Sequence, residues 1–161
     1  YVIFNAIVLG VFAAVYHWFP KFTGHMYYEG LGKLHFALTF IGCTLNWLPL
    51  HWAGLLGMPR RVASYDPEFA IWNVIASVGA FLLGVAAIPF ILNMVSSWAR
   101  GPKAPPNPWG AIGLEWLLPS PPPAENFEDD VPTVLNNPYG YGLDQPQVAD
   151  EAFYVRRAQE A

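Results

Sequence analysis

Three long apolar segments, separated by short stretches that carry charge, dominate the first hundred positions of the chain. The segments cover about residues 1–19, 34–57 and 69–95, and none of them contains Asp, Glu, Lys or Arg. A helix that crosses the hydrocarbon core of a bilayer needs about 20 apolar residues. The pattern therefore predicts three transmembrane helices within residues 1–98.

The pattern changes at residue 99. Eleven of the sixteen prolines lie beyond Arg100, and nine of the twelve acidic residues lie from Glu115 onward. Proline runs favour extended polyproline geometry, and such a segment either lies along a partner surface or stays partly disordered. Residues 99–161 are therefore predicted to form a Pro-rich, acidic tail outside the membrane. The predicted fold class is an all-α membrane protein with three transmembrane helices and this tail.

Proline and its neighbours indicate where the helices begin, end and bend. Pro20, Gly24, Gly30 and Gly32 are expected to break the pattern after the first apolar segment. Pro49 and Pro89 are expected to bend the second and third. Asp66 and Pro67 are typical of a helix start, with Asp66 at the N-cap and Pro67 at the first helical position.

Composition agrees with a membrane protein. Hydrophobic residues make up 54% of the chain and charged residues 12%, whereas soluble domains contain about 25% charged residues. The eight basic residues form no broad patch, so we expect no nucleic-acid partner. Cys43 is the one cysteine, lies in an apolar segment, and is interpreted as a small packing residue.

The distribution of basic residues predicts the orientation of the helices. Three membrane crossings place the first loop and the tail on one side, where four basic residues lie near the membrane: Lys21, Lys33, Arg100 and Lys103. Arg60 and Arg61 lie on the opposite side. Because cytoplasmic loops carry more Lys and Arg, the tail is predicted to be cytoplasmic.

The loop between the second and third apolar segments contains the candidate binding residues, Arg60 and Arg61. Arginine is always charged in practice and needs a partner or water near hydrocarbon. The pair can act as two forks for carboxylates or phosphates, or as a basic flank that touches lipid head groups. Its place on the side that the charge rule disfavours makes a specific anionic partner the better explanation.

The histidines lack the spacing of metal ligands. His35 and His51 share one segment but are sixteen residues apart, about 24 Å along a helix. His17 and His25 flank Pro20 with no Cys or carboxylate at ligand spacing. No nucleophile constellation or phosphate-binding glycine loop occurs either. We therefore predict no catalytic and no metal-ligating residue in the chain.

Four short motifs follow one another along the chain: Tyr16-His17-Trp18-Phe19-Pro20-Lys21, Gly32-Lys33-Leu34-His35-Phe36, Leu55-Leu56-Gly57-Met58-Pro59-Arg60-Arg61 and Leu114-Glu115-Trp116. Ser120-Pro121-Pro122-Pro123 and Asn126-Phe127 follow them. Together they resemble the C-terminal part of subunit I of the haem-copper oxidases, most closely the bacterial cytochrome c oxidases. The resemblance runs from Tyr1 to about Phe127.

The resemblance implies that the three helices are the last three of a twelve-helix subunit. It implies that Arg60 and Arg61 bind haem propionates on the outer face of the membrane. In that family the ligands of the two haems and the copper lie upstream, and the last His-x-His pair would end immediately before Tyr1. The segment would then supply propionate contacts and part of the wall around a haem site built by other parts of the subunit. It would be inactive alone.

The implied function is that of a terminal respiratory oxidase in the bacterial cytoplasmic membrane. It would reduce oxygen to water with electrons from cytochrome c, coupled to proton translocation, with other oxidase subunits and membrane lipid as partners. A quinol oxidase of the same superfamily is an alternative, although Pro59 and the Lys33-Leu34-His35-Phe36 run favour cytochrome c. A further alternative is a non-catalytic three-span protein whose arginines bind lipid and whose tail docks a partner.

Overall fold

The computed structural model describes residues 1–111, 113–127, 133–134 and 154–155. Its helices and strands are α1 (Val2–Thr23), α2 (Glu29–Leu55), the 3-10 helix η1 (Pro67–Phe69), α3 (Ala70–Arg100), the 3-10 helix η2 (Leu114–Leu117), β1 (Thr133–Val134) and β2 (Tyr154–Val155). The two strands pair antiparallel, with Thr133 opposite Val155.

The chain divides into two compact units. The first contains Tyr1–Val15 and Tyr27–Ala99, and the second contains Tyr16–Met26 and the chain from Arg100 onward. Helix α1 contributes to both units, since its last residues group with the Pro-rich segment. The predicted division into a transmembrane region, residues 1–98, and a tail, residues 99–161, remains a prediction.

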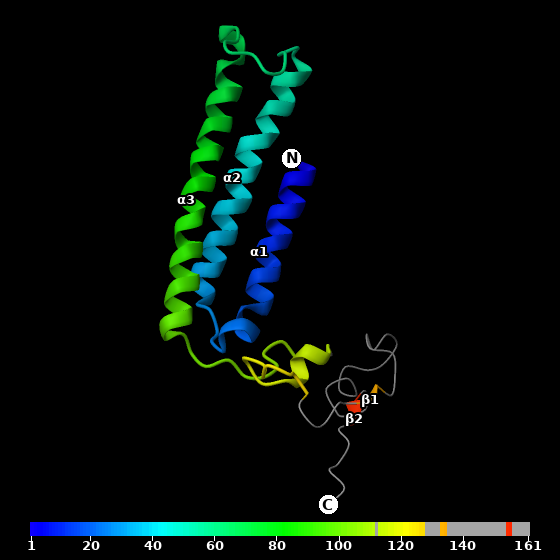
Figure 1. Cartoon of the computed structure of the whole chain (residues 1–161). Coiled ribbons are helices and arrows are strands. Elements are labelled where there is room, and N and C mark those ends of the chain that lie inside the picture. The colour runs from blue at the N-terminus through cyan, green and yellow to red at the C-terminus, as the bar shows by residue number, and fades with distance from the viewer. Residues whose placement is uncertain (112, 128–132, 135–153, 156–161) are drawn as a thin grey trace, which may run out of the picture. The chain divides into compact units, whose positions relative to one another are not determined.

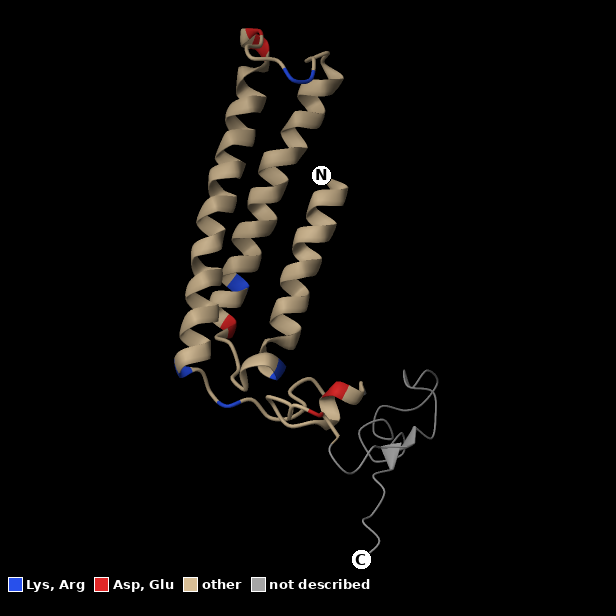
Figure 2. Ribbon diagram, viewed as in Figure 1, with Lys and Arg blue, Asp and Glu red and all other residues tan. Residues whose placement is uncertain are grey.

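In the first unit, the helices α1, α2 and α3 lie side by side (Figure 1). Two stretches, Val2–Thr23 and Pro67–Arg100, are long and apolar enough to cross a membrane, and few of their residues are buried within the protein. Lys, Arg, Asp and Glu lie near the helix ends (Figure 2). The chain is therefore mostly helical, as expected of an all-α membrane protein.

Helix α2 has the length of a membrane span but is less apolar than α1 and α3. Its first turns carry Glu29 and Lys33, and its later turns carry Asn46 and His51. The Nζ of Lys33 donates to Oε2 of Glu29 at 2.9 Å on the exposed surface. That hydrogen bond and the charge of Lys33 lower the pKa of Glu29. A third membrane crossing, through α2, remains a prediction.

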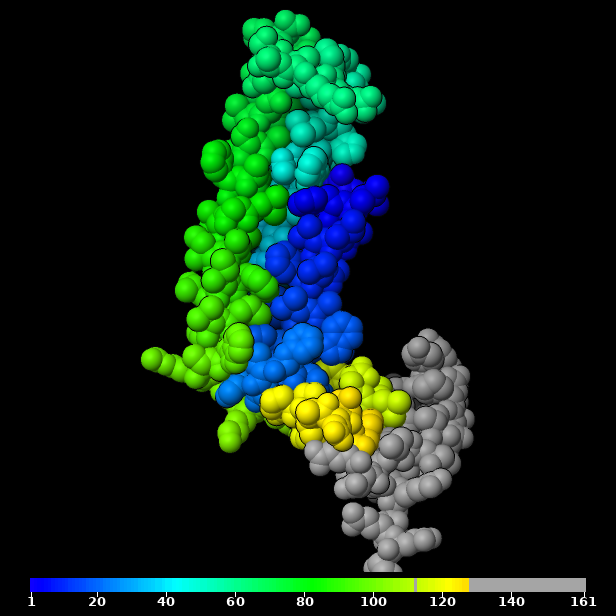
Figure 3. Space-filling model, viewed as in Figure 1, coloured from blue at the N-terminus to red at the C-terminus, as the bar shows by residue number. Residues whose placement is uncertain are grey.

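Close contact between α2 and α3 depends on a glycine. A Cβ added to Gly79 would lie 2.3 Å from the backbone nitrogen of Asn46 and 2.6 Å from the carbonyl carbon of Leu45. Gly42 meets Leu83 in a second close contact, in which an added Cβ would lie 3.0 Å from the leucine side chain. Small residues let two helix backbones approach in this way. In the space-filling view, α2 lies against α3 where α1 does not cover it (Figure 3).

A polar network joins the start of α2 to the last turns of α3. Asn93, which is fully buried, accepts from the amide of Tyr28 at 2.9 Å and donates to the carbonyl of Tyr28 at 3.0 Å. Ser97, also fully buried, donates to Oδ1 of Asn93 at 3.0 Å. Buried polar side chains need such partners, because an unpaired one destabilises the fold.

The first helix break lies at Gly24, one of the four residues at which the sequence predicts it. Helix α1 continues through Pro20 to Thr23, and α2 begins at Glu29, so the break is short. Pro20 lies in the last helical turn, where its missing N–H removes one hydrogen bond without stopping the helix. Gly24 ends α1, since it adopts a φ of 72° that favours glycine.

The predicted start of the third helix is confirmed in position. Asp66 occupies the N-cap of η1 and Pro67 its first turn, and α3 follows directly at Ala70. The Asp66 side chain makes no capping hydrogen bond. Pro49 and Pro89 lie inside α2 and α3, which are continuous at both positions, and the bends expected there remain predictions.

In the second unit, the end of α1 contacts the Pro-rich segment through a buried lysine. Nζ of Lys21 donates to the carbonyl oxygens of Leu118 at 2.8 Å and Pro106 at 2.9 Å. A third carbonyl, that of Pro119, lies at 3.4 Å, and the ammonium lies 5.1 Å from the ring centroid of Trp116. The Lys21 side chain is 5% exposed, so its charge is held by carbonyls in place of water.

Main-chain and aromatic contacts extend this attachment. The amide of Met26 donates to the carbonyl of Pro102, and the amide of Ala104 donates to the carbonyl of Gly24, each at 2.8 Å. Nε1 of Trp109 donates to the carbonyl of His17 at 2.9 Å. The described part of the Pro-rich segment therefore has defined contacts within its own unit.

Candidate functional site

The loop with the two arginines begins at the end of α2, in a Schellman motif. The amide of Gly57 donates to the carbonyl of Gly54 at 3.1 Å, and the amide of Met58 donates to that of Ala53 at 3.0 Å. Gly57 has a φ of 99°, which glycine adopts without the steric penalty of a Cβ. This pair of bonds is the usual way to satisfy the last carbonyls of a helix.

The loop ends in the short helix η1. The amide of Phe69 donates to the carbonyl of Asp66 at 3.0 Å, and the Phe69 side chain is 4% exposed. We call residues 57–68 the arginine loop. Both of its ends are therefore fixed to helices, one by main-chain hydrogen bonds and the other by a buried aromatic ring.

Arg60 and Arg61 lie exposed near the middle of the arginine loop. Arg61 has a φ of 59°, which is uncommon for a residue other than glycine. Asp66 and Glu68 lie in the same loop, yet within the described residues neither arginine forms an ion pair with a carboxylate. The two guanidinium groups are thus free to receive an anion.

The four histidines lie beside main-chain carbonyls or aromatic rings. Nδ1 of His25 and Nδ1 of His51 lie 3.0 Å and 2.9 Å from main-chain carbonyls of their own segments. His17 and His35 lie against aromatic rings, His17 among three tryptophans and His35 beside two phenylalanines. Across residues 1–111 and 113–127, no group of three His, Cys, Asp or Glu side chains is placed to hold a metal ion.

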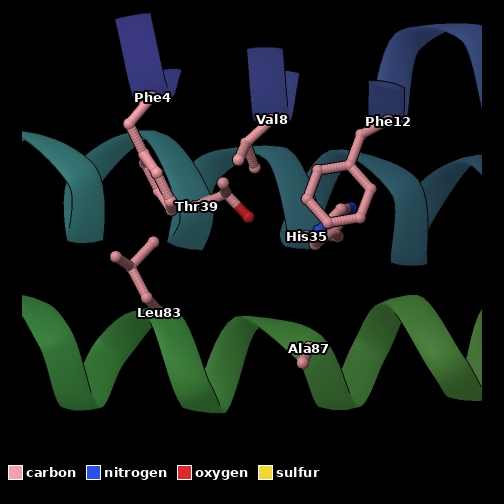
Figure 4. A pocket seen from close by; sticks show the side chains of 7 residues that line it. All are labelled: Phe4, Val8, Phe12, His35, Thr39, Leu83 and Ala87. Carbon is pink, nitrogen blue, oxygen red and sulfur yellow. The ribbon is translucent and has the colours of Figure 1, made fainter. Parts of the chain in front are cut away.

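A cavity of about 190 Å³ lies among α1, α2 and α3. Seven side chains line it: Phe4, Val8, Phe12, His35, Thr39, Leu83 and Ala87. Figure 4 shows the α1 residues directed toward α2 and Leu83 directed toward the same space from α3. Apart from His35 and Thr39 the lining is apolar, so the cavity suits an apolar group better than water.

Two polar residues near the helix ends make contacts that the sequence patterns do not predict. Asn73 donates from Nδ2 to Sδ of Met58 at 3.4 Å, and so contacts the arginine loop. Lys21 donates to carbonyls of the Pro-rich segment. Lys21 closes the first of the four motifs, but no pattern in the sequence indicates the acceptors, which are a thioether sulfur and main-chain carbonyls.

Comparison with known proteins identifies the family. Residues 1–82 match the family model described as cytochrome c and quinol oxidase polypeptide I. The chain is 50% identical over 147 residues to cytochrome c oxidase subunit 1 of Thermostichus vulcanus, which covers 91% of the chain and 26% of the relative. It is 48% identical over 151 residues to that of Synechocystis sp., covering 94% and 27%.

A relative with another domain composition also matches. The chain is 43% identical over 135 residues to the heme-copper oxidase subunit I+III of Aeropyrum pernix, covering 83% of the chain and 16% of that relative. The alignments extend beyond Phe127, so the similarity is longer than the motifs indicate. The chain spans about a quarter of the length of the subunit 1 relatives. It belongs to the family of cytochrome c and quinol oxidase polypeptide I, the subunit I of haem-copper oxidases.

Proposed function

We propose that this chain is part of the catalytic subunit of a terminal respiratory oxidase, and that Arg60 and Arg61 hold haem propionates. The oxidase would reduce oxygen to water with electrons from cytochrome c and translocate protons. The observation that carries this proposal is the arginine pair itself. Two exposed guanidinium groups occupy a loop whose ends are fixed, in a chain of the oxidase family.

The arginine pair fits a haem propionate in charge and in hydrogen-bonding capacity. A haem carries two propionate carboxylates, and a guanidinium presents several donors in a rigid fork that matches a carboxylate. Asp66 and Glu68 form no ion pair with either arginine in the described loop. The haem, when bound, supplies the electron transfer. Arg60 and Arg61 would bind and orient it and balance the charge of its carboxylates.

The metal ligands of the oxidase are proposed to come from outside this segment. His17, His25, His35 and His51 are spread over both units and form no shared site within the described residues. The haem and copper chemistry would therefore take place at a centre to which this segment contributes propionate contacts and part of the surrounding wall.

The proposed topology has three crossings, through α1, α2 and α3. The arginine loop then lies on the outer face, and the chain from Arg100 onward lies in the bacterial cytoplasm. Basic residues near the membrane favour this orientation, with four on the tail side and two in the arginine loop. The exposed apolar side chains of all three helices would contact lipid or other helices of the oxidase.

The haem content of the purified oxidase tests the propionate contact. Replacing both Arg60 and Arg61 by Gln removes two charges but keeps side chains of similar polarity. We expect the double variant to retain less haem than the parent oxidase when both are purified in the same detergent. Full haem retention with an unchanged haem spectrum would favour the alternative in which the arginines bind lipid head groups.

The electron donor distinguishes cytochrome c oxidase from quinol oxidase. Pro59 and the Lys33-Leu34-His35-Phe36 run support cytochrome c, and the relatives from Thermostichus vulcanus and Synechocystis sp. are named cytochrome c oxidase subunit 1. Oxygen uptake by the oxidase should therefore be supported by reduced cytochrome c. Uptake with a quinol alone would assign the chain to the quinol branch of the family.

A further inference from the structure

The side-chain amide of Asn73 contacts Met58, near the start of the arginine loop, and Phe69, directly after its end. Asn73 lies in the first turn of α3, and its Nδ2 donates to the carbonyl of Phe69 at 2.9 Å. The same Nδ2 donates to Sδ of Met58 at 3.4 Å. An amide NH₂ group has two hydrogens, so it can serve both acceptors at once. One polar group thereby joins the two ends of the loop.

Met58 is held from two helices. Its amide closes the last turn of α2 through the carbonyl of Ala53, and its sulfur receives the hydrogen bond from α3. Arg60 follows two residues later. The position of Met58 relative to α3 therefore sets where the main chain enters the arginine pair.

The opposite end of the loop has a matching anchor. The Phe69 ring is buried, and its carbonyl is the second acceptor of the Asn73 amide. Between the two anchors, Arg61 adopts a left-handed conformation that few non-glycine residues adopt. Such a conformation persists when the surrounding structure determines it, and the two anchors provide that constraint.

We propose that Asn73 is a positioning residue for Arg60 and Arg61. This inference rests on the proposed propionate contact and extends it to a residue that does not touch the anion. Two guanidinium groups on a free loop would lose conformational entropy when they bind a haem propionate. The Asn73 amide reduces that loss by holding the loop ends at a fixed separation before binding.

Two substitutions each remove the hydrogen bond between the Asn73 amide and the Met58 sulfur. Asn73→Leu removes the donor at similar volume, and Met58→Leu removes the sulfur acceptor while keeping an apolar side chain of similar size. Ser77→Ala is the matched control, since Ser77 lies one turn further along α3 and donates to the main-chain carbonyl of Asn73. All variants are made in the assembled oxidase that contains the chain.

Amide hydrogen exchange of residues 58–68 and the haem midpoint potential are then measured on the same preparations. We expect Asn73→Leu and Met58→Leu each to speed exchange in the loop by about threefold to tenfold, the range expected for one modest hydrogen bond. The double variant should be no faster than Asn73→Leu alone. The haem potential should shift in the direction that Arg60→Gln produces, and Ser77→Ala should change neither quantity.

The outcomes are distinguishable. Unchanged loop exchange in Asn73→Leu would overturn the anchoring contact, whatever the haem does. Faster exchange with an unshifted potential, when Arg60→Gln does shift it, would overturn the positioning role. If Arg60→Gln itself leaves the potential and the haem content unchanged, the propionate contact fails and the positioning role fails with it.

Discussion

Nζ of Lys21 donates a hydrogen bond to the carbonyl oxygen of Leu118 at 2.8 Å, and so joins residues 97 positions apart in the chain. The same ammonium reaches the carbonyls of Pro106 and Pro119 and lies over the ring of Trp116. A lysine ammonium has three N–H donors, and three carbonyls surround it here. The lysine ammonium thus joins the end of α1 to three main-chain carbonyls of a Pro-rich segment whose described secondary structure before Phe127 is the short helix η2 and a single β-bridge.

Replacing Lys21 with Met should loosen the Pro-rich segment. The methionine fills a similar volume but leaves buried carbonyls without a donor, which should lower the local stability of residues 102–119 by about 1–3 kcal/mol. Limited proteolysis or amide hydrogen exchange over those residues measures the change. Lys33→Met is the control, because Lys33 forms an exposed pair with Glu29 and such pairs contribute little. Equal protection in both variants would show that Lys21 does not hold the segment.

Replacing Asn93 with Leu should weaken the attachment of α2 to α3. The change removes two hydrogen bonds to the main chain of Tyr28 and leaves its carbonyl without this donor, at an expected loss of about 1–3 kcal/mol. The midpoint of thermal unfolding in detergent measures the effect. Ser96→Ala should leave the midpoint nearly unchanged, because Ser96 bonds to main-chain carbonyls of its own helix. A similar midpoint for Asn93→Leu and Ser96→Ala would contradict a structural role for the network.

Replacing Gly79 with Ala should force α2 and α3 apart. The added methyl carbon would meet main-chain atoms of Leu45 and Asn46, which cannot move as a flexible side chain would. Overpacking of this kind destabilises by about 1–3 kcal/mol. Thermal unfolding of the assembled oxidase is the measurement. Gly84→Ala is the matched control on the same helix, since nothing lies within 4 Å of its added Cβ. Our account fails at this contact if the two variants unfold at the same temperature.

Much of the helical fold follows from the apolar pattern. Three uncharged segments give three helices, and Asp66 with Pro67 marks the start of the last one. The position of the first helix break is predicted less sharply. Of the residues that the pattern offers, Pro20 lies in a final turn that tolerates it, and Gly24 ends the helix. The effect of a proline depends on its place in a helix, and an apolar pattern does not define that place to within a few residues.

The candidate site also has one part that the sequence predicts and one part that it does not. Arg60 and Arg61 stand out in the sequence because a charged pair at the edge of an apolar region is unusual. The contacts of Asn73 and Lys21 are not predictable in this way, because their acceptors are a thioether sulfur and main-chain carbonyls. The partners of such donors depend on how distant segments meet, and local sequence does not encode that arrangement.

The reduction midpoint potential of the haems in the assembled oxidase tests the central claim most directly. Arg60→Gln and Arg61→Gln are each compared with the parent by optical redox titration. Lys33→Gln serves as the charge-matched control, since Lys33 lies in the second turn of α2, about 33 Å along the helix axis from its last residue, Leu55. Removing a cation beside a propionate disfavours the reduced, more negative haem, so either arginine variant should lower a haem potential while Lys33→Gln leaves it unchanged. Haem potentials equal to the parent's in both arginine variants, with full haem content, would contradict the role of Arg60 and Arg61 as propionate ligands.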